Sequence, residues 1–230
     1  MPKVENGNAS CTPANGIASS SFYGRVNAVS EAPATYHMNL QRLRKAGIGS
    51  WGYDCNLCPL RQSASQVVWG AGNFNAKIML IGEGPGFNED RLGQPFVGRA
   101  GKLLDTILFN SALRRDELFI TNRVRCRPPE NRRPTPIEME TCDAWTEKEI
   151  ETVGPKVIIS LGNSAIQRAF PGRKIGEVSG LARSTSLGKE QTPTVQIATY
   201  HPAAALRNPD LTKEIIEAMQ TAKEIANAVG

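Results

Sequence analysis

Four of the five cysteines have a spacing that is typical of a metal site. Cys55 and Cys58 form a C-x-x-C pair, and Cys126 and Cys142 follow far downstream with fifteen residues between them. Four thiolates suit either tetrahedral zinc or a four-iron cluster, and spacing alone does not choose between these metals. The uneven second pair does not resemble a compact zinc ribbon. The alternative is a set of buried free cysteines.

A second candidate site is the stretch 82–101, GEGPGFNEDRLGQPFVGRAG, which directly follows the apolar run 77–81. A helix-like pattern begins at residue 102. Ligands of α/β proteins often bind where a buried strand ends in such a loop, because glycines let a substrate approach the backbone and a helix start offers free N–H donors. The stretch is also compatible with an ordinary strand-to-helix connection or a phosphate cradle.

Polar residues stand where three apolar strands end. Glu83 follows the first strand, Asn122 the second and His201 the last. Because the carboxyl ends of parallel strands lie at one edge of a sheet, these groups are predicted to converge on a small polar ligand. Simpler interpretations are a turn cap for Asn122 and a backbone-bonded structural histidine for His201.

An aromatic residue and many arginines accompany this candidate site. Phe96, between proline and valine, is either a core residue or an exposed platform for stacking a base. Basic residues outnumber acidic ones between positions 91 and 133, and they include Arg99, Arg125 and Arg127. Such a cluster beside a ligand loop indicates phosphate contacts, although a solvated basic surface would look the same.

The composition describes an ordinary soluble protein. The chain has 230 residues, 40% hydrophobic and 21% charged, with a net charge of +5. No apolar run reaches membrane-spanning length, and the first residues lack a signal-peptide apolar region, so neither a membrane nor a secreted protein is expected. In a reducing cytoplasm, clustered cysteines bind metal or do redox chemistry more often than they form disulfides.

The elements that would position these residues alternate along the chain. Residues 1–34 are rich in Ser, Ala, Asn and Gly and are expected to form a flexible extension, whereas residues 35–230 form one domain, beginning with a short helix at 35–46. The expected strands are 77–81, 118–120, 157–161 and 195–199, and the longer helices are 102–111, 135–153 and 209–229. Short apolar strands between helices predict a parallel sheet covered on both faces. Residues 173–193 look irregular, with room for short strands.

Four motifs, in order, resemble those of the iron–sulfur uracil-DNA glycosylases, known as family four. They are GEGPG (82–86), PFVGRAG (95–101), TN followed by RCRPP (121–129) and HPAAALRNP (201–209). The resemblance covers about residue 55 to the C-terminus. It implies a three-layer α/β/α sandwich around a short four-stranded parallel sheet, plus a metal-cluster loop. It also implies a [4Fe-4S] cluster, rather than zinc, on Cys55, Cys58, Cys126 and Cys142, in a monomeric protein of a bacterial or archaeal cytosol.

The resemblance implies a monofunctional hydrolase that starts base excision repair. It would flip deoxyuridine out of single- or double-stranded DNA and cleave the bond between base and sugar. Phe96 would stack on the uracil, Asn122 would bind its O4 and N3–H, and His201 would donate to O2. Glu83 would support catalysis, with a role as general base left open. Backbone contacts to the base would come from Gly84, Pro85 and Gly86.

Other residues would contact the DNA itself. The 201–209 loop would press into the minor groove, where Leu206 or Arg207 would act as the wedge because Ala205 stands where the family often has a larger residue. Arg207 could instead contact phosphate, as would Arg99, Arg125 and Arg127.

Two other functions stay open. A DNA-binding module of the same fold without catalysis is suggested by Ala205 and by Gly84, where other uracil glycosylases carry an acidic or amide side chain. A nucleotide-binding α/β enzyme that acts on phosphates is disfavoured, because the chain has no G-x-x-x-x-G-K-[ST] sequence.

Overall fold

The computed structural model describes residues 55–187 and 192–229. The expected N-terminal extension at 1–34 and the helix expected at 35–46 lie outside these residues. Among the described residues, no helix has the length and apolar composition needed to cross a membrane.

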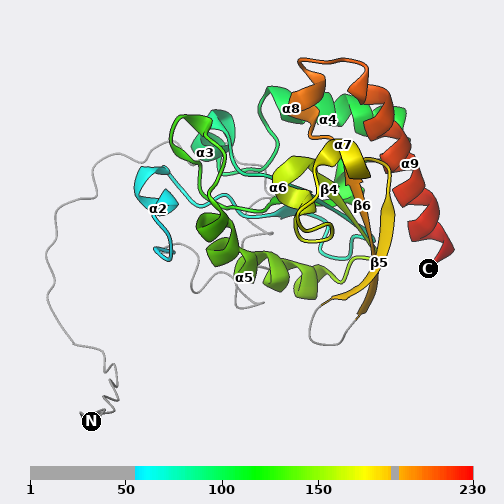
Figure 1. Ribbon diagram of the computed structural model, residues 1–230, viewed down its shortest axis with the longest axis horizontal. Helices are drawn as coiled ribbons and strands as arrows, with labels where there is room; N and C mark the ends of the chain where they lie inside the picture. Colours follow the sequence, from blue (N-terminus) through cyan, green and yellow to red (C-terminus); the bar gives the residue numbers. More distant parts are fainter. Residues whose placement is uncertain (1–54, 188–191, 230) are drawn as a thin grey trace, which may run out of the picture. The chain divides into compact units, whose positions relative to one another are not determined.

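A six-stranded sheet forms the centre of the described part of the chain, in the order β1-β3-β2-β4-β6-β5 (Figure 1). Its four inner strands run parallel: β2 (Ile78–Gly82), β3 (Phe119–Asn122), β4 (Val157–Leu161) and β6 (Thr192–Thr199). All four were predicted from their apolar runs.

The prediction of a purely parallel, four-stranded sheet is wrong, because two antiparallel strands extend its edges. They are β1 (Ala71–Gly72), which pairs with β3, and β5 (Ala182–Leu187), which pairs with β6. The sequence of β5, ARSTSL, is mostly exposed and carries no apolar alternation that would reveal a strand. β1 is two residues long. The sheet is therefore mixed.

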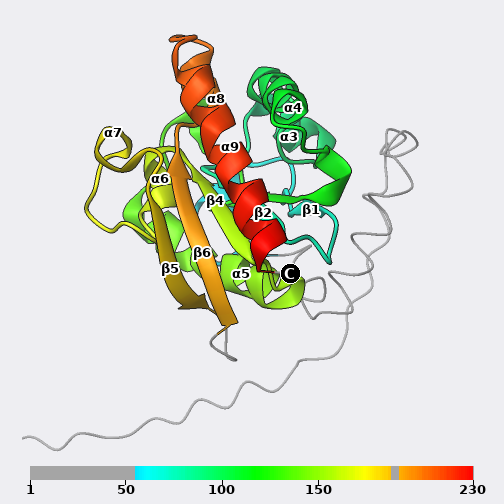
Figure 2. The same ribbon diagram turned by 90° about the vertical axis from the view of Figure 1, so that its right-hand side faces the viewer.

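Helices cover both faces of the sheet, as expected (Figure 2). On one face, Ile78 and Leu80 of β2 pack in the same apolar cluster as α4 (Arg99–Asn110) and α9 (Leu211–Ala228). On the other face, Met79 and Ile81 pack in the cluster that contains α5 (Pro136–Val153). Alternate residues of one fully buried strand thus serve two cores, which explains why β2 is apolar throughout.

The helix α5 begins and ends at the predicted signals. The Thr135 hydroxyl accepts a hydrogen bond from the Glu138 N–H, the Glu138 carboxylate accepts one from the Thr135 N–H at 2.8 Å, and Pro136 occupies the first turn. Gly154, in the left-handed conformation, ends the helix. These caps fix which α5 side chains face the sheet.

Shorter helices lie in the connections. They are α2 (Leu60–Ser63), α3 (Phe87–Leu92), α6 (Gly162–Ile166), α7 (Ile175–Val178) and α8 (Pro202–Ala205), with single 3-10 turns at Arg115–Glu117 and Pro129–Asn131. From β2 the chain moves to β3 on one side, and it later places β4 on the other side of β2. The carboxyl ends of β2 and β4 therefore border the crevice where open α/β sheets bind ligands.

Candidate functional site

Three of the predicted side chains meet beside the end of β2. The Phe96 and His201 rings are stacked, with centroids 5.3 Å apart and planes at 26°. A Cβ on Gly82 would overlap the Asn122 side-chain oxygen and lie 2.6 Å from Cζ of Phe96. Glycine at this position therefore lets the asparagine and the phenylalanine approach the same stretch of backbone.

Phe96 is held in an unusual conformation. It is buried and has a positive φ of 54°, which a phenylalanine adopts at a cost. The Arg115 guanidinium donates to the Phe96 carbonyl at 3.0 Å and to the Pro95 carbonyl at 2.8 Å. A Cβ on Gly101 would collide with the Phe96 carbonyl. The surroundings thus fix the ring before any ligand binds.

His201 is arranged as a neutral hydrogen-bond donor. Its Nδ1 accepts the N–H of Ala203 at 3.1 Å, at the start of α8. Burial lowers the pKa of His201 to about 4, against the opposite effect of the Glu89 carboxylate. The imidazole is therefore neutral near pH 7, and because Nδ1 accepts, the proton must reside on Nε2. Nε2–H is the group that can donate to a ligand.

Asn122 ends β3 with its side chain almost fully buried. Its backbone carbonyl accepts a hydrogen bond from Arg125, whereas its side-chain amide bonds to none of the residues that the structure describes. Buried amides normally satisfy their donors and acceptors. An amide that is left available in a crevice is suited to read the edge of a polar ligand.

Glu83 directly follows β2 and is oriented by Ser164, a residue that was not among the predicted site residues. The Ser164 hydroxyl donates to the Glu83 carboxylate at 2.5 Å and accepts from Nε of Arg133 at 3.1 Å. Ser164 is fully buried in α6, directly after β4. The sequence signal for Ser164 was its position, because it follows β4, the strand that borders β2 at the topological switch point.

Gly84 lies too close to a neighbouring side chain to carry one of its own. A Cβ there would lie 2.7 Å from Cγ2 of Val124, which is fully buried. A water-activating side chain at this position would therefore require Val124 to move. Glu83 is the carboxylate that stands next to it.

Glu89 joins the two ends of the glycine-rich loop. Its carboxylate accepts hydrogen bonds from the N–H groups of Val97 at 2.9 Å, Gly98 at 2.7 Å and Gly86 at 3.2 Å. Glu89 was also not among the predicted site residues. The signal was a glutamate three positions after a glycine that caps a helix.

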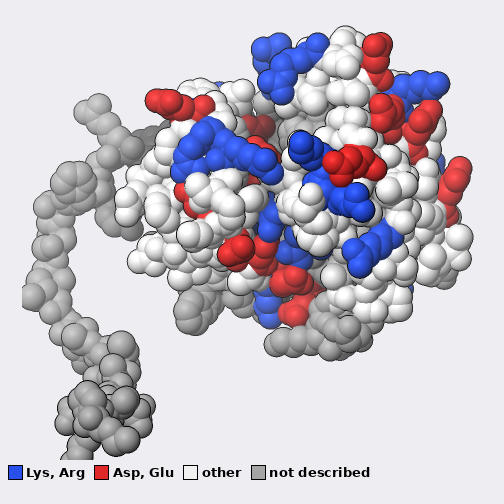
Figure 3. All heavy atoms as spheres, viewed as in Figure 1, with Lys and Arg blue, Asp and Glu red and all other residues white. Residues whose placement is uncertain are grey.

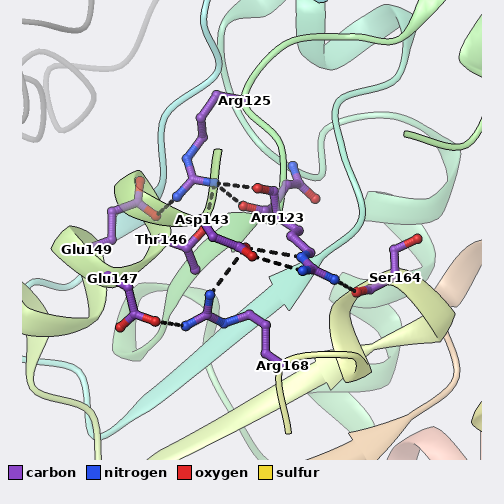
Figure 4. A network of polar contacts seen from close by, with 9 residues as sticks. Arg123, Arg125, Asp143, Thr146, Glu147, Glu149, Ser164 and Arg168 are labelled. Carbon is purple, nitrogen blue, oxygen red and sulfur yellow. Dashed lines mark hydrogen bonds and ion pairs between the residues drawn. The ribbon is translucent and has the colours of Figure 1, made fainter. Parts of the chain in front are cut away.

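The assignment of Arg125 to a DNA contact is wrong. Its side chain is 1% exposed and forms an ion pair with Glu149, which is completely buried, at 2.6 Å (Figure 4). The same guanidinium donates to the Asn122 carbonyl and to the Thr146 hydroxyl. Because Arg125 stands in an arginine-rich stretch, it was predicted to lie at the surface. Its partner Glu149 lies on α5, inside the core.

A second ion-paired group continues this arrangement toward α6 (Figure 4). Arg123 donates to Asp143 of α5 at 2.9 and 3.1 Å and to the Ser164 carbonyl at 2.8 Å. Arg168 binds Asp143 and Glu147 from the opposite side. Through these contacts α5 supports the loop after β3 and the serine that orients Glu83.

The loop predicted to act as a wedge has exposed side chains at its end. Leu206 is 40% exposed and Arg207 is exposed, so both can meet a partner. The Ala205 side chain is buried in the cluster with α4 and α9, so the assignment of a DNA contact to it is wrong.

Arg99 is exposed on the first turn of α4. Basic side chains gather over α3, beside α6 and around α8 (Figure 3).

The four cysteines pack against one hydrophobic cluster, with Cys126 and Cys142 buried and Cys55 and Cys58 partly buried. Burial, followed by the proximity of the other three, raises the pKa of the Cys126 thiol to about 12. Burial raises the pKa of the Cys142 thiol to about 11.

No group of His, Cys, Asp or Glu within residues 55–187 and 192–229 is arranged to hold a single metal ion. Four neighbouring thiols from three segments nevertheless fit the donor set of a metal cluster, whose positive charge would stabilise the thiolates.

Comparisons with known proteins agree with the motifs at this site. A family model described as the uracil DNA glycosylase superfamily matches residues 69–223. The type-4 uracil-DNA glycosylase of Thermotoga maritima is 39% identical over 180 residues, which cover 76% of this chain and 91% of the relative. That of Archaeoglobus fulgidus is 41% identical over 165 residues, 70% of this chain and 82% of the relative. A type-5 uracil-DNA glycosylase of Pyrobaculum aerophilum is 33% identical over 133 residues, 49% of this chain and 58% of the relative.

Proposed function

The chain belongs to the uracil-DNA glycosylase superfamily, and from this premise we propose that it is a type-4 uracil-DNA glycosylase, which flips deoxyuridine out of DNA and hydrolyses the bond between uracil and sugar. The observation that carries the proposal is that Phe96, Asn122 and His201 meet beside the end of β2. A base inside the duplex cannot reach these side chains, so extrusion precedes chemistry.

Uracil is recognised by stacking and by its polar edge. The fixed ring of Phe96 supports one face of the base, which contributes about 1–3 kcal/mol. The available amide of Asn122 pairs with O4 and N3–H. Cytosine reverses that pattern of donor and acceptor, and leaving buried groups unpaired costs about 1–3 kcal/mol for each group. The backbone of residues 84–86 adds contacts to the base.

His201 stabilises the departing base. As the bond to the sugar breaks, negative charge develops on uracil O2, and the neutral Nε2–H is positioned by the bond between Nδ1 and Ala203 to donate to it. Removing one preorganised donor of this kind commonly raises the barrier by about 3–4 kcal/mol. Because the imidazole is already neutral, it needs no deprotonation before it acts.

Glu83 orients the water that captures the sugar. The sugar passes through an oxocarbenium-like state, which a nearby carboxylate stabilises. One Glu83 oxygen is held by Ser164, which leaves the other to contact water and the cationic sugar. The packing of Gly84 against Val124 explains why the carboxylate comes from the preceding residue.

In this proposal the four cysteines bind a [4Fe-4S] cluster. When bound, the cluster would cross-link three segments and partly compensate the charge of the four thiolates. It would fix the loop after β3, in which Cys126 directly follows the residue that holds the Asn122 carbonyl.

A uracil-bearing oligonucleotide followed by alkaline cleavage of abasic sites tests the activity. We expect strand cleavage from iron-replete protein and its loss in His201→Ala, with DNA affinity largely kept. A non-catalytic module predicts binding without release of uracil. Absence of strand cleavage from iron-replete protein refutes the enzyme. Colourless protein with stoichiometric zinc refutes the iron cluster.

A further inference from the structure

An aromatic side chain is presented to solvent beside the uracil site. Phe87 is the first residue of α3, directly after the 84–86 backbone, and 60% of its surface is exposed. Three residues span at most about 11 Å, so this ring lies close to the backbone that contacts the base. Neither uracil recognition nor the core uses it.

Arg127 fixes one side of this ring. Its guanidinium carbon lies 5.2 Å from the centroid of Phe87, and its Nε donates to the Asn131 side-chain oxygen at 2.8 Å. Glu130 and Asn131 form a turn with positive φ angles of 54° and 56°, which places that oxygen under the guanidinium. A cation on an aromatic face is a stabilising contact. The ring is therefore held in place while more than half of its surface stays open.

An exposed aromatic next to a fixed cation is the combination that proteins use to bind single-stranded nucleic acid. Bases stack on the ring whatever their identity, because every base has a π-face, and the cation attracts the phosphates. The chain offers a contrast in Phe109, which is 81% exposed near the end of α4, away from the α4 terminus that faces the site. No cation is stacked on Phe109 within the described residues.

We propose that Phe87 and Arg127 form a stacking platform for the nucleobase adjacent to the flipped uracil, in an unpaired strand. The inference rests on the proposed function for the position of the uracil. In a duplex the adjacent base is already paired and stacked, so the platform contributes mainly to binding of single strands. It would make the protein tolerant of sequence around the uracil while favouring uracil in single-stranded DNA.

Fluorescence anisotropy with full-length, iron-replete protein tests the platform. The probe is a single strand with one 2′-fluoro-deoxyuridine, whose fluorine opposes positive charge on the sugar and prevents cleavage. We expect Phe87→Ala to weaken binding of the single strand about tenfold, which corresponds to about 1.4 kcal/mol, and binding of the matched duplex much less. Phe87→Trp should retain affinity, and Phe109→Ala is the matched control with no change.

The neighbouring base is then removed from the probe. An abasic residue on one side of the uracil should weaken binding by the parent about tenfold and leave the Phe87→Ala variant unaffected, because the stacking partner is already missing. The proposal is overturned if Phe87→Ala binds as tightly as the parent, if Phe109→Ala weakens binding equally, or if removal of neither the 5′ nor the 3′ neighbour weakens binding by the parent more than binding by Phe87→Ala. The binding assay needs no catalysis, so binding through Phe87 together with no alkaline strand cleavage of the unmodified uracil oligonucleotide would refute the glycosylase and leave the platform standing.

Discussion

Replacing Glu149 by glutamine should strongly destabilise the protein. The Glu149 side chain is completely buried, and its two oxygens have different partners: one accepts from Arg125 at 2.6 Å and the other from the Gly70 N–H at 3.0 Å. Glutamine keeps the shape of the side chain and one hydrogen-bond acceptor. It removes the charge that compensates a guanidinium that is 1% exposed.

The size of the effect follows from the uncompensated charge. Removing one partner of a buried ion pair costs about 3–5 kcal/mol. For a domain of this size, each kcal/mol lowers the melting temperature by about 2–4 °C, so the expected decrease is about 6–20 °C. The double variant Arg125→Met/Glu149→Leu removes both charges and should lose less stability than the sum of the two single changes.

Urea unfolding of iron-replete protein, followed by circular dichroism, measures these differences. Glu151→Gln is the matched control, because that side chain is exposed on the same helix. Uracil release by Glu149→Gln should also decrease, since Arg125 holds the carbonyl of Asn122. A stability within about 1 kcal/mol of the parent, or a double variant that loses the full sum, would show that the pair does not support the core in this way.

Three further changes test the site. Burial lowers the pKa of His201 to about 4, so the native protein binds fewer protons than the unfolded chain between about pH 4 and 6.5. Up to about 3 kcal/mol of stability, present above pH 6.5, is therefore lost as the pH falls through this window. In His201→Gln, the pH dependence of the urea unfolding midpoint should become flatter. Gly101→Ala forces the Phe96 carbonyl to move and should lower kcat/KM about 100-fold, whereas Lys102→Ala, on an exposed side chain, should change it little. Ser164→Ala releases Glu83 and should lower kcat at least about tenfold with little change in KM, and Ser164→Thr should restore part of the rate; equal rates in alanine and threonine variants would contradict the role of the hydroxyl.

The inner sheet was predictable because its strands are buried on both faces, so each of them contains at least two apolar residues. β5 was not predictable, because an edge strand with exposed side chains is stabilised by pairing with β6 and not by its own composition. The α5 helix was predictable from local chemistry, since Thr135 and Glu138 cap it without any tertiary contact.

The candidate site divides in the same way. Asn122 and His201 were predictable because they stand at strand ends, and topology alone brings strand ends together. Arg125 was misassigned because its burial depends on Glu149, twenty-four residues away on another element. Pairings over such separations leave no periodic pattern in a sequence.

The three amides bound by Glu89 have a consequence for loop dynamics. Val97 and Gly98 are adjacent and come eleven residues after Gly86, yet the N–H groups of all three share one carboxylate. Hydrogen exchange at these three positions should therefore occur in one concerted opening, and Glu89→Gln should accelerate all three together. Residues 87–96, which lie between these amides, would then move together as one unit. Access to the site would depend on breaking the three hydrogen bonds to the Glu89 carboxylate.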